Sequence, residues 1–176
     1  NPSEKEGFCL LATFAYFTAM KEKKVEFEYR EYSDIRELDQ ADAALLQQAR
    51  DITSQAYAPY SNFHVGAAAL LANGETAVGT NQENAAYPVG TCAERVLLGI
   101  AATLHHNIPI KSMAVSYSGD EVKSDHPISP CGMCRQALLE YESRMKEPIR
   151  LILGSMEGKV YVIESASLLL PLAFKY

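Results

Sequence analysis

Two cysteine clusters constrain the fold of this chain more than any other feature of its sequence. Cys92 lies two residues before Glu94, and Cys131 and Cys134 lie much further along the chain. A closed structural zinc site uses four protein ligands, whereas a catalytic site uses three and leaves the fourth position for water. Three thiols beside a glutamate therefore predict one catalytic zinc ion per subunit, and they require a fold that brings the two clusters together.

Each cluster lies where a loop is expected to become a helix. The sequence predicts these helices over residues 92–105 and 131–144. A helix N-terminus carries partial positive charge and free N–H groups, and both stabilise thiolates. Cys131 and Cys134 share one helix face at i, i+3 spacing, so Cys92 would supply the third ligand from the other helix.

Glu94 is the expected proton carrier of such a site. Zinc lowers the pKa of bound water to about 7, and a general acid/base beside it contributes about 10²–10⁴ in rate. A glutamate in a first helical turn is also compatible with a solvated charge that the helix dipole favours. Its position two residues after Cys92 favours the catalytic role.

Charge balance adds a hypothesis about arginine. Three thiolates around a dication leave a net negative charge, which weakens the metal as a Lewis acid. Arg95 and Arg135 each follow a cluster directly and are the candidates for offsetting that charge. We expect Arg95 to donate hydrogen bonds to the thiolate sulfurs, with a surface salt bridge as the alternative.

Length and composition limit the classes of function. The chain has 176 residues, a formal charge of −6 and scattered basic residues. This length predicts one domain with a core of its own. Nucleic-acid-binding proteins usually carry a basic stripe, so we expect a small neutral substrate and no nucleic-acid partner. No segment reaches the ~18 apolar residues of a membrane span, so we expect no membrane association.

The cysteines also indicate the redox compartment. Cys131 and Cys134 lie on one helical turn, which is a poor arrangement for a mutual disulfide. Reduced, metal-binding thiols are typical of a cytoplasmic enzyme. Cys9 lies outside both clusters and is expected to be a free thiol. Residues 8–20 have the length of a signal-peptide core, but no cleavage pattern accompanies them, so an extra helix is expected.

The hydrophobic periodicity predicts a helix over residues 39–57 in addition to the two cysteine-bearing helices. An edge strand is expected over residues 25–30, where apolar and charged side chains alternate. Further strands are expected over residues 65–72, 75–79, 110–117, 149–153 and 158–163, with a hairpin turn at Asn73-Gly74. This order predicts an α/β domain in which helices cover a mixed sheet.

Several motifs together resemble one family. They are Cys92-Ala93-Glu94 with Pro130-Cys131-Gly132-Met133-Cys134, Tyr60 to Ala68, Asn81 to Tyr87, and Ser129 to Gln136. In these motifs the chain resembles the zinc-dependent cytidine deaminases that act on free nucleosides, in the homotetrameric form with three cysteine ligands. The likeness runs from about Asp39 to Phe174. It implies a three-layer α/β/α fold with a mixed five-stranded sheet over residues 39–176, preceded by an extension, residues 1–38.

The resemblance implies a role for each matching residue. Cys92, Cys131 and Cys134 would hold zinc, and Glu94 would shuttle protons. Asn81 and Glu83 would hydrogen-bond the ribose hydroxyls, Phe63 would form an aromatic wall, and the Ala93 backbone and the Ser129 carbonyl would read the base. Phe174 would reach the site of a neighbouring subunit. Gln82 departs from the apolar residue that is usual between the Asn and the Glu, and its side chain is expected to point away from the sugar.

The expected reaction is hydrolytic deamination of cytidine and deoxycytidine to uridine and deoxyuridine in pyrimidine salvage. One rival is a deaminase of a nucleoside-like antibiotic such as blasticidin, and a weaker one edits RNA or DNA. A rival from another class is a structural zinc module that mediates protein contacts. That module would need a fourth ligand, for which His126 and His106 are the candidates.

Overall fold

The computed structural model describes residues 20–119 and 123–175. Six strands form one sheet in the order β1-β6-β5-β4-β2-β3. Cys9 and nearly all of the apolar stretch 8–20 lie outside the described residues, so the predictions about them stay predictions. The strands are β1 (Arg30–Tyr32), β2 (Phe63–Leu71), β3 (Thr76–Thr80), β4 (Ile110–Gly119), β5 (Arg150–Leu153) and β6 (Val160–Ile163).

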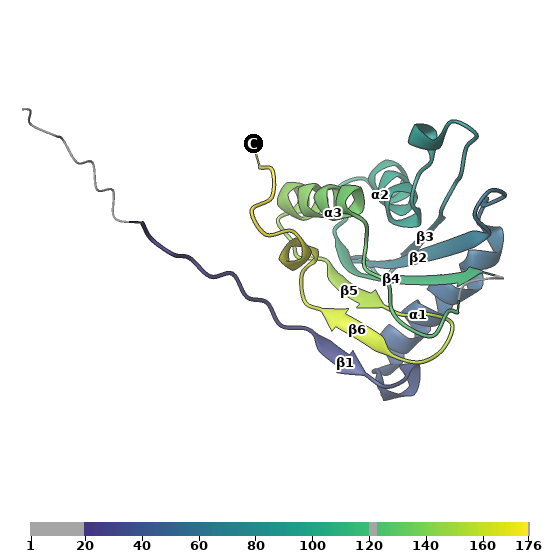
Figure 1. The fold of residues 1–176 in the computed structure, drawn as a ribbon, viewed down its shortest axis with the longest axis horizontal. Helices are drawn as coiled ribbons and strands as arrows, with labels where there is room; N and C mark the ends of the chain where they lie inside the picture. Colours follow the sequence, from purple (N-terminus) through teal and green to yellow (C-terminus); the bar gives the residue numbers. More distant parts are fainter. Residues whose placement is uncertain (1–19, 120–122, 176) are drawn as a thin grey trace, which may run out of the picture.

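Helices cover both faces of this sheet and make three layers (Figure 1). One face packs against α1 (Gln40–Ile52) through a cluster that includes Leu46, Ala68 and Ile152. The other face packs against α2 (Ala93–Leu104) and α3 (Gly132–Met145), which lie side by side. Burial of apolar side chains on both faces of the central strands is what makes them continuous hydrophobic runs in the sequence.

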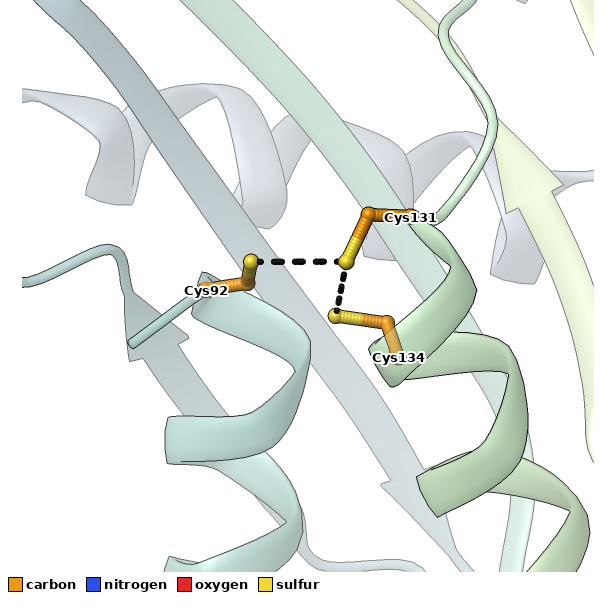
Figure 2. Close-up of side chains that lie close together, drawn as sticks. All are labelled: Cys92, Cys131 and Cys134. Carbon is orange, nitrogen blue, oxygen red and sulfur yellow. Dashed lines mark hydrogen bonds between the residues drawn. The ribbon is translucent and has the colours of Figure 1, made fainter. Parts of the chain in front are cut away.

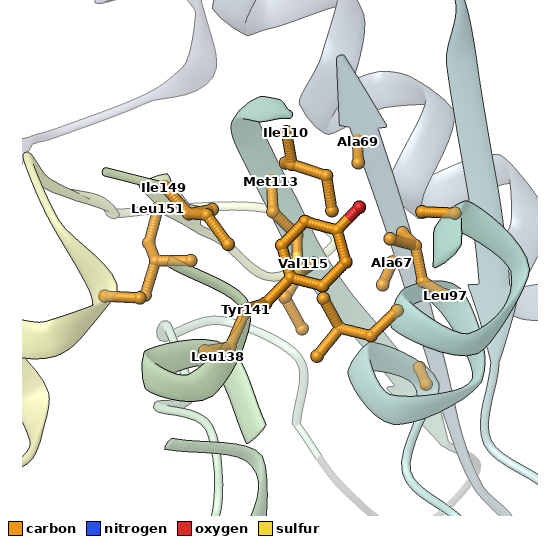
Figure 3. Close-up of a cluster of buried hydrophobic side chains, with 14 of the residues drawn as sticks. Ala67, Ala69, Leu97, Ile110, Met113, Val115, Leu138, Tyr141, Ile149 and Leu151 are labelled. Carbon is orange, nitrogen blue, oxygen red and sulfur yellow. The ribbon is translucent and has the colours of Figure 1, made fainter. Parts of the chain in front are cut away.

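The core between the sheet and the two cysteine-bearing helices is the larger one. Figure 3 shows Leu138 and Tyr141 of α3 meeting Val115 of β4 and Leu97 of α2 in this cluster. Because α2 and α3 share this core, their N-terminal ends are held at the same end of the molecule. The core thereby positions both cysteine clusters before any metal is considered.

Strand directions confirm the mixed sheet. β4 and β5 run parallel, whereas each other neighbouring pair is antiparallel. Residues 39–176 supply five strands, β2 to β6, as expected, and β1 from residues 1–38 pairs with β6 as a sixth strand. That strand occupies residues 30–32 rather than 25–30. Its three residues pair with Val160–Val162 of β6, and the alternating residues before Arg30 are exposed.

Local signals in the sequence explain the boundaries of α1 and the β2–β3 hairpin. The Asp39 side chain accepts a hydrogen bond from the backbone N–H of Asp42, at 2.9 Å, and so caps α1. Gly74 has φ +86 at the hairpin turn, a conformation that glycine adopts without steric cost. Within residues 20–119 and 123–175, the helices are too short or too polar to cross a bilayer.

Candidate metal centre

Three cysteine sulfurs converge where α2 and α3 begin. Cys92 precedes the first residue of α2, Cys131 precedes the first residue of α3, and Cys134 lies in the first turn of α3. The Sγ atoms of Cys92 and Cys131 are 3.7 Å apart, and those of Cys131 and Cys134 are 3.5 Å apart. Figure 2 shows the three side chains pointing toward one another across the gap between the helices.

The spacing of the sulfurs fits zinc. Three thiolates at about 2.3 Å from one tetrahedral zinc ion would have their sulfurs about 3.8 Å apart. All three Sγ atoms lie within 4.8 Å of one another, and no other group of three or more His, Cys, Asp or Glu in the described part of the chain meets the same test. The donor set also fits, because soft thiolate ligands are those that zinc accepts in proteins.

The fold places Cys92 by a close contact between strand and helix. Gly79 in β3 lies against the first turn of α2, where a Cβ atom would stand 2.8 Å from the Ala93 carbonyl oxygen and 2.6 Å from the Leu97 nitrogen. A side chain at this position would push the start of α2 away from the sheet. The glycine therefore allows the α2 N-terminus, and Cys92 with it, to lie directly on the sheet edge.

The local electrostatics favour a thiolate. A hydrogen bond with the Cys134 thiol, another with Cys131 and the charge of Arg95 lower the pKa of Cys92 to about 6, although burial opposes them. Hydrogen bonding to Cys92 and burial raise the pKa of Cys134. One thiol is thus poised to ionise first while its neighbour holds a proton. A metal ion must displace that proton in order to bind all three sulfurs.

Glu94 is buried beside the sulfurs, with 5% of its surface exposed. Burial raises its pKa, and the charge of Cys92 raises it further, while a hydrogen bond with the Cys134 thiol acts in the opposite direction. This environment does not fit the alternative of a solvated charge in a first helical turn. A buried carboxyl group with a raised pKa is a suitable proton carrier near neutral pH, and the assignment of that role to Glu94 stays a prediction.

The two arginines after the clusters lie in different surroundings. Arg95 is half-buried and lowers the pKa of Cys92 through its charge, but within the described residues its side chain makes no hydrogen bond to sulfur. Arg135 donates through Nε to the Pro130 carbonyl at 2.8 Å and through Nη1 to the Leu169 carbonyl at 3.1 Å. The Arg135 guanidinium thus ties the loop before Cys131 to the C-terminal segment.

Two of the expected ribose-binding residues lie next to the metal ligands. A surface hollow is lined by Asn81 and Glu83 together with Cys92. The Asn81 side chain accepts from the Val65 N–H at 2.7 Å and donates to the Phe63 carbonyl at 2.8 Å. The Asn81 oxygen retains a lone pair and its nitrogen retains a second hydrogen, so a further partner can still bind.

Glu83 holds the loop that precedes β2. Its carboxylate accepts from the Tyr60 N–H at 2.8 Å and from the Ser61 hydroxyl at 2.5 Å. These bonds lower the pKa of Glu83, and the bond from the Ser61 hydroxyl has the largest effect. Gln82, which lies between Asn81 and Glu83 in the sequence, donates through its side-chain amide to the Thr80 hydroxyl, at 3.0 Å. Gln82 also lines the hollow, so the expectation that its side chain points away from the sugar stays a prediction.

The remaining expected contacts surround the same end of the molecule. Phe63, at the start of β2, is half-buried and stacks on Tyr117. Ala93 is fully buried. Ser129, two residues before Cys131, is exposed and lines a cleft with Tyr29 and Tyr161. The part of Ser129 that would read the base is its backbone carbonyl, and that role stays a prediction.

Phe174 lies apart from the sulfurs. Its side chain is 77% exposed, and its carbonyl accepts a hydrogen bond from Gln136 of α3, at 3.0 Å. The backbone of the tail is thus fixed to the helix that carries Cys134, while the ring faces outward. The expected contact of this ring with the site of a neighbouring subunit stays a prediction.

Within the described residues, no histidine joins the three cysteines as a fourth zinc ligand. The His126 ring lies 2.9 Å from the Asp125 carboxylate, and His106 follows the far end of α2. Across the described residues, the ligand group contains cysteines alone. A closed four-ligand structural zinc site, which the interaction-module alternative requires, is therefore not supported.

Two residues that the fold brings to the site, Ser61 and Tyr117, carry no clear functional signal in the sequence. Ser61 lies within a motif that was recognised, yet its contact with Glu83 depends on how two distant loops meet. Tyr117 was read only as part of a strand, although its ring supports Phe63. Nothing in the sequence distinguishes Tyr117 from the other polar residues of its strand, which include Ser112 and Ser116.

Fold and site together define a three-layer α/β/α protein with a three-thiolate metal centre beside a buried glutamate. The model of the cytidine and deoxycytidylate deaminase zinc-binding region matches residues 39–147. A cytidine deaminase of Halalkalibacterium halodurans is 35% identical over 130 residues, which are 74% of this chain and 91% of the relative. The chain belongs to the cytidine and deoxycytidylate deaminase family, and zinc is its cofactor.

A solved structure supports the same conclusion. The crystal structure of cytidine deaminase from Burkholderia pseudomallei superposes with a TM-score of 0.65 at 40% identity, and it covers 74% of this chain and 97% of that one. A blasticidin-S deaminase of Bacillus cereus is also similar, at 30% identity over 139 residues, 78% of this chain and 94% of the relative. The expected three-layer fold and the expected family are confirmed.

Proposed function

We propose that this chain catalyses the hydrolytic deamination of cytidine and deoxycytidine to uridine and deoxyuridine, with release of ammonia. The observation that carries the proposal is the convergence of three cysteine sulfurs within 4.8 Å of one another beside the buried Glu94. Water and the nucleoside are the only reactants. The uridine or deoxyuridine product carries the oxygen of water at C4, and the exocyclic nitrogen leaves as ammonia.

In this mechanism Cys92, Cys131 and Cys134 would hold zinc, which when bound supplies an activated water at neutral pH. Glu94 would accept a proton from the attacking water and pass it to ring N3 as oxygen adds to C4. Glu94 would then carry the second proton of the same oxygen to the exocyclic amine, and ammonia would leave. Its buried position keeps bulk water away from the proton that it carries.

The pocket favours a nucleoside over a nucleotide. Asn81 and Glu83 are proposed to bind the ribose hydroxyls, Phe63 to form the wall against the pyrimidine, and the Ala93 backbone and Ser129 carbonyl to read the base. The carboxylate of Glu83 would repel a 5′-phosphate that approached its side of the hollow. The overall charge of −6 points the same way.

We further propose that the enzyme is a cytoplasmic homotetramer in pyrimidine salvage. An apolar groove between α2 and α3, lined by Leu98, Ala102 and Tyr141, offers a surface for another copy. The exposed Phe174 ring supports a contact with a neighbouring site. Three unpaired thiols fit a reducing compartment. Residues 39–176 would form the deaminase domain and residues 1–38 its extension.

One experiment tests the central proposal. The purified chain, assayed for cytidine by ultraviolet absorbance and for zinc by metal analysis, should deaminate cytidine and hold about one zinc ion per subunit. Glu94→Gln should lose activity by at least about 10²-fold, within the range of a general acid/base, while zinc remains bound. Glu147→Gln, which changes an exposed carboxylate, is the matched control. Retained turnover in Glu94→Gln would refute the role of Glu94.

The likeness to a blasticidin-S deaminase makes a nucleoside-like antibiotic the second candidate substrate. The same metal centre would serve a nucleoside-like antibiotic, so the discrimination lies with Asn81, Glu83 and Phe63. A two-substrate assay separates the candidates. We expect the kcat/KM for cytidine to exceed that for blasticidin S, and the reverse order would favour the antibiotic as substrate.

A further inference from the structure

One buried tyrosine contacts both Phe63 and the segment that leads into Ser129. Tyr117 of β4 is fully buried, and the Phe63 ring stacks on it with centroids 5.1 Å apart and an interplanar angle of 28°. The two strands are paired so that Val65 lies opposite Tyr117. The aromatic wall is therefore backed by a second ring rather than by solvent.

The hydroxyl of the same tyrosine contacts the segment that follows β4. It lies 2.9 Å from the His126 carbonyl and 3.2 Å from the Lys123 carbonyl, and its single hydrogen is shared between them. The His126 ring also packs edge-on against Tyr117, with centroids 6.2 Å apart. These contacts hold the segment that leads into Ser129 and Cys131.

A second hydroxyl fixes that segment at the same place. Ser124 Oγ donates to the Tyr117 carbonyl at 2.5 Å and accepts from the Met156 N–H at 2.9 Å. The Glu157 N–H in turn donates to the Ser124 carbonyl, at 3.3 Å. The path from β4 to the second cysteine cluster is thus tied to the end of β4 and to the turn between β5 and β6.

We propose that Tyr117 is a positioning residue for the substrate, because it sets the distance between the Phe63 wall and the segment that carries Ser129. The inference rests on the proposed function, since Phe63 and Ser129 would contact the base. Tyr117 itself lies behind the Phe63 ring and takes no part in proton transfer. Its loss should weaken binding of the nucleoside and leave the chemical step at Glu94 unchanged.

The test compares two buried tyrosines. Tyr117→Phe keeps the stacked ring and removes only the hydroxyl, so KM for cytidine should rise by about threefold to tenfold, as expected for one lost hydrogen bond. The kcat should stay within about twofold, the pattern of lost uniform binding. Tyr141→Phe is the control, because the Tyr141 hydroxyl also donates to a backbone carbonyl, that of Ile108, in the same core.

A second pair of variants checks the loop contact. Ser124→Ala should raise KM in the same way, whereas Ser116→Ala should not, since within the described residues the buried Ser116 hydroxyl has no hydrogen-bond partner. Thermal melting should show all four variants folded. An equal KM for Tyr117→Phe and Tyr141→Phe in an active enzyme would overturn this inference alone. A wild-type chain without cytidine deaminase activity would overturn it together with the proposed function.

Discussion

The three cysteines of the metal centre differ in their exposure to solvent. Cys134 is buried, Cys92 is half-buried and Cys131 is exposed. The exposed sulfur marks the side from which a metal can enter, and the buried one lies beside Glu94, whose pKa it affects. The buried carboxyl group of Glu94 thus adjoins Cys134, whereas the hollow that Asn81 and Glu83 line adjoins Cys92.

At the residue scale, Arg95 provides a test of charge compensation. Its guanidinium favours the Cys92 thiolate without a direct bond to sulfur in the described residues. Arg95→Gln should weaken zinc binding by about 10-fold, the lower end of what outer-sphere groups contribute. Competition with a chromogenic chelator measures this affinity. Arg36→Gln, which alters an exposed arginine paired with Asp34, should leave it unchanged, and equal affinities for both variants would exclude the role.

Residue types and spacing predicted the zinc ligands because metal chemistry restricts both. The same sequence could not predict Tyr117 or Ser61, since their partners depend on the register between β2 and β4 and on the packing of two loops. Arg135 was predicted near the thiolates, but its guanidinium binds two backbone carbonyls instead. Charge alone does not say whether an arginine will meet a sulfur or an unpaired carbonyl.

At the scale of elements, close backbone contacts set the positions of the helices. Gly66 of β2 faces α1, where a Cβ atom would stand 2.2 Å from the Ala49 carbonyl oxygen and 2.7 Å from Ile52 Cγ2. Gly79 plays the corresponding part for α2 on the other face. The sequence showed both residues only as small members of predicted strands, because nothing local reveals how closely a helix will approach.

Gly66→Ala tests this packing. The added methyl group must push α1 away from the sheet, which should destabilise the fold by about 1–3 kcal/mol, the usual cost of overpacking. Gly132→Ala is the control, since a Cβ atom there meets nothing within 4 Å. Urea denaturation followed by circular dichroism measures both free energies of unfolding. Equal stability of the two variants would contradict the close approach of α1.

Hydrophobic periodicity predicted the bounds of most elements to within a few residues. It succeeded for α2 and α3, whose buried faces repeat regularly, and for β2, which is apolar from Val65 onward. It misplaced the edge strand, since alternating side chains run from Val25 to Tyr29, but the residues that pair with β6 are Arg30–Tyr32. Edge strands depend on a neighbour that local patterns do not reveal.

At the scale of the whole molecule, zinc should stabilise the fold by linking two helices that share one core. The ion would connect the N-terminal ends of α2 and α3, so its removal by a strong chelator should lower the melting temperature. A ligand present at 1,000 times its Kd stabilises the native state by about 4 kcal/mol. Zinc should restore the transition, and magnesium should not, because thiolates are poor ligands for it. An unchanged melting temperature after complete metal removal would contradict this linkage.

Strand β1 has a consequence for any shortened form of the chain. The resemblance to known deaminases begins near Asp39, and a chain cut there would lose the three residues that pair with β6. The uncovered ladder could then recruit another molecule and aggregate. Light scattering should detect such particles in a chain starting at Asp39 and none in one starting at Glu28. The segment before Asp39 would then keep the sheet edge of one molecule from pairing with that of another and precipitating.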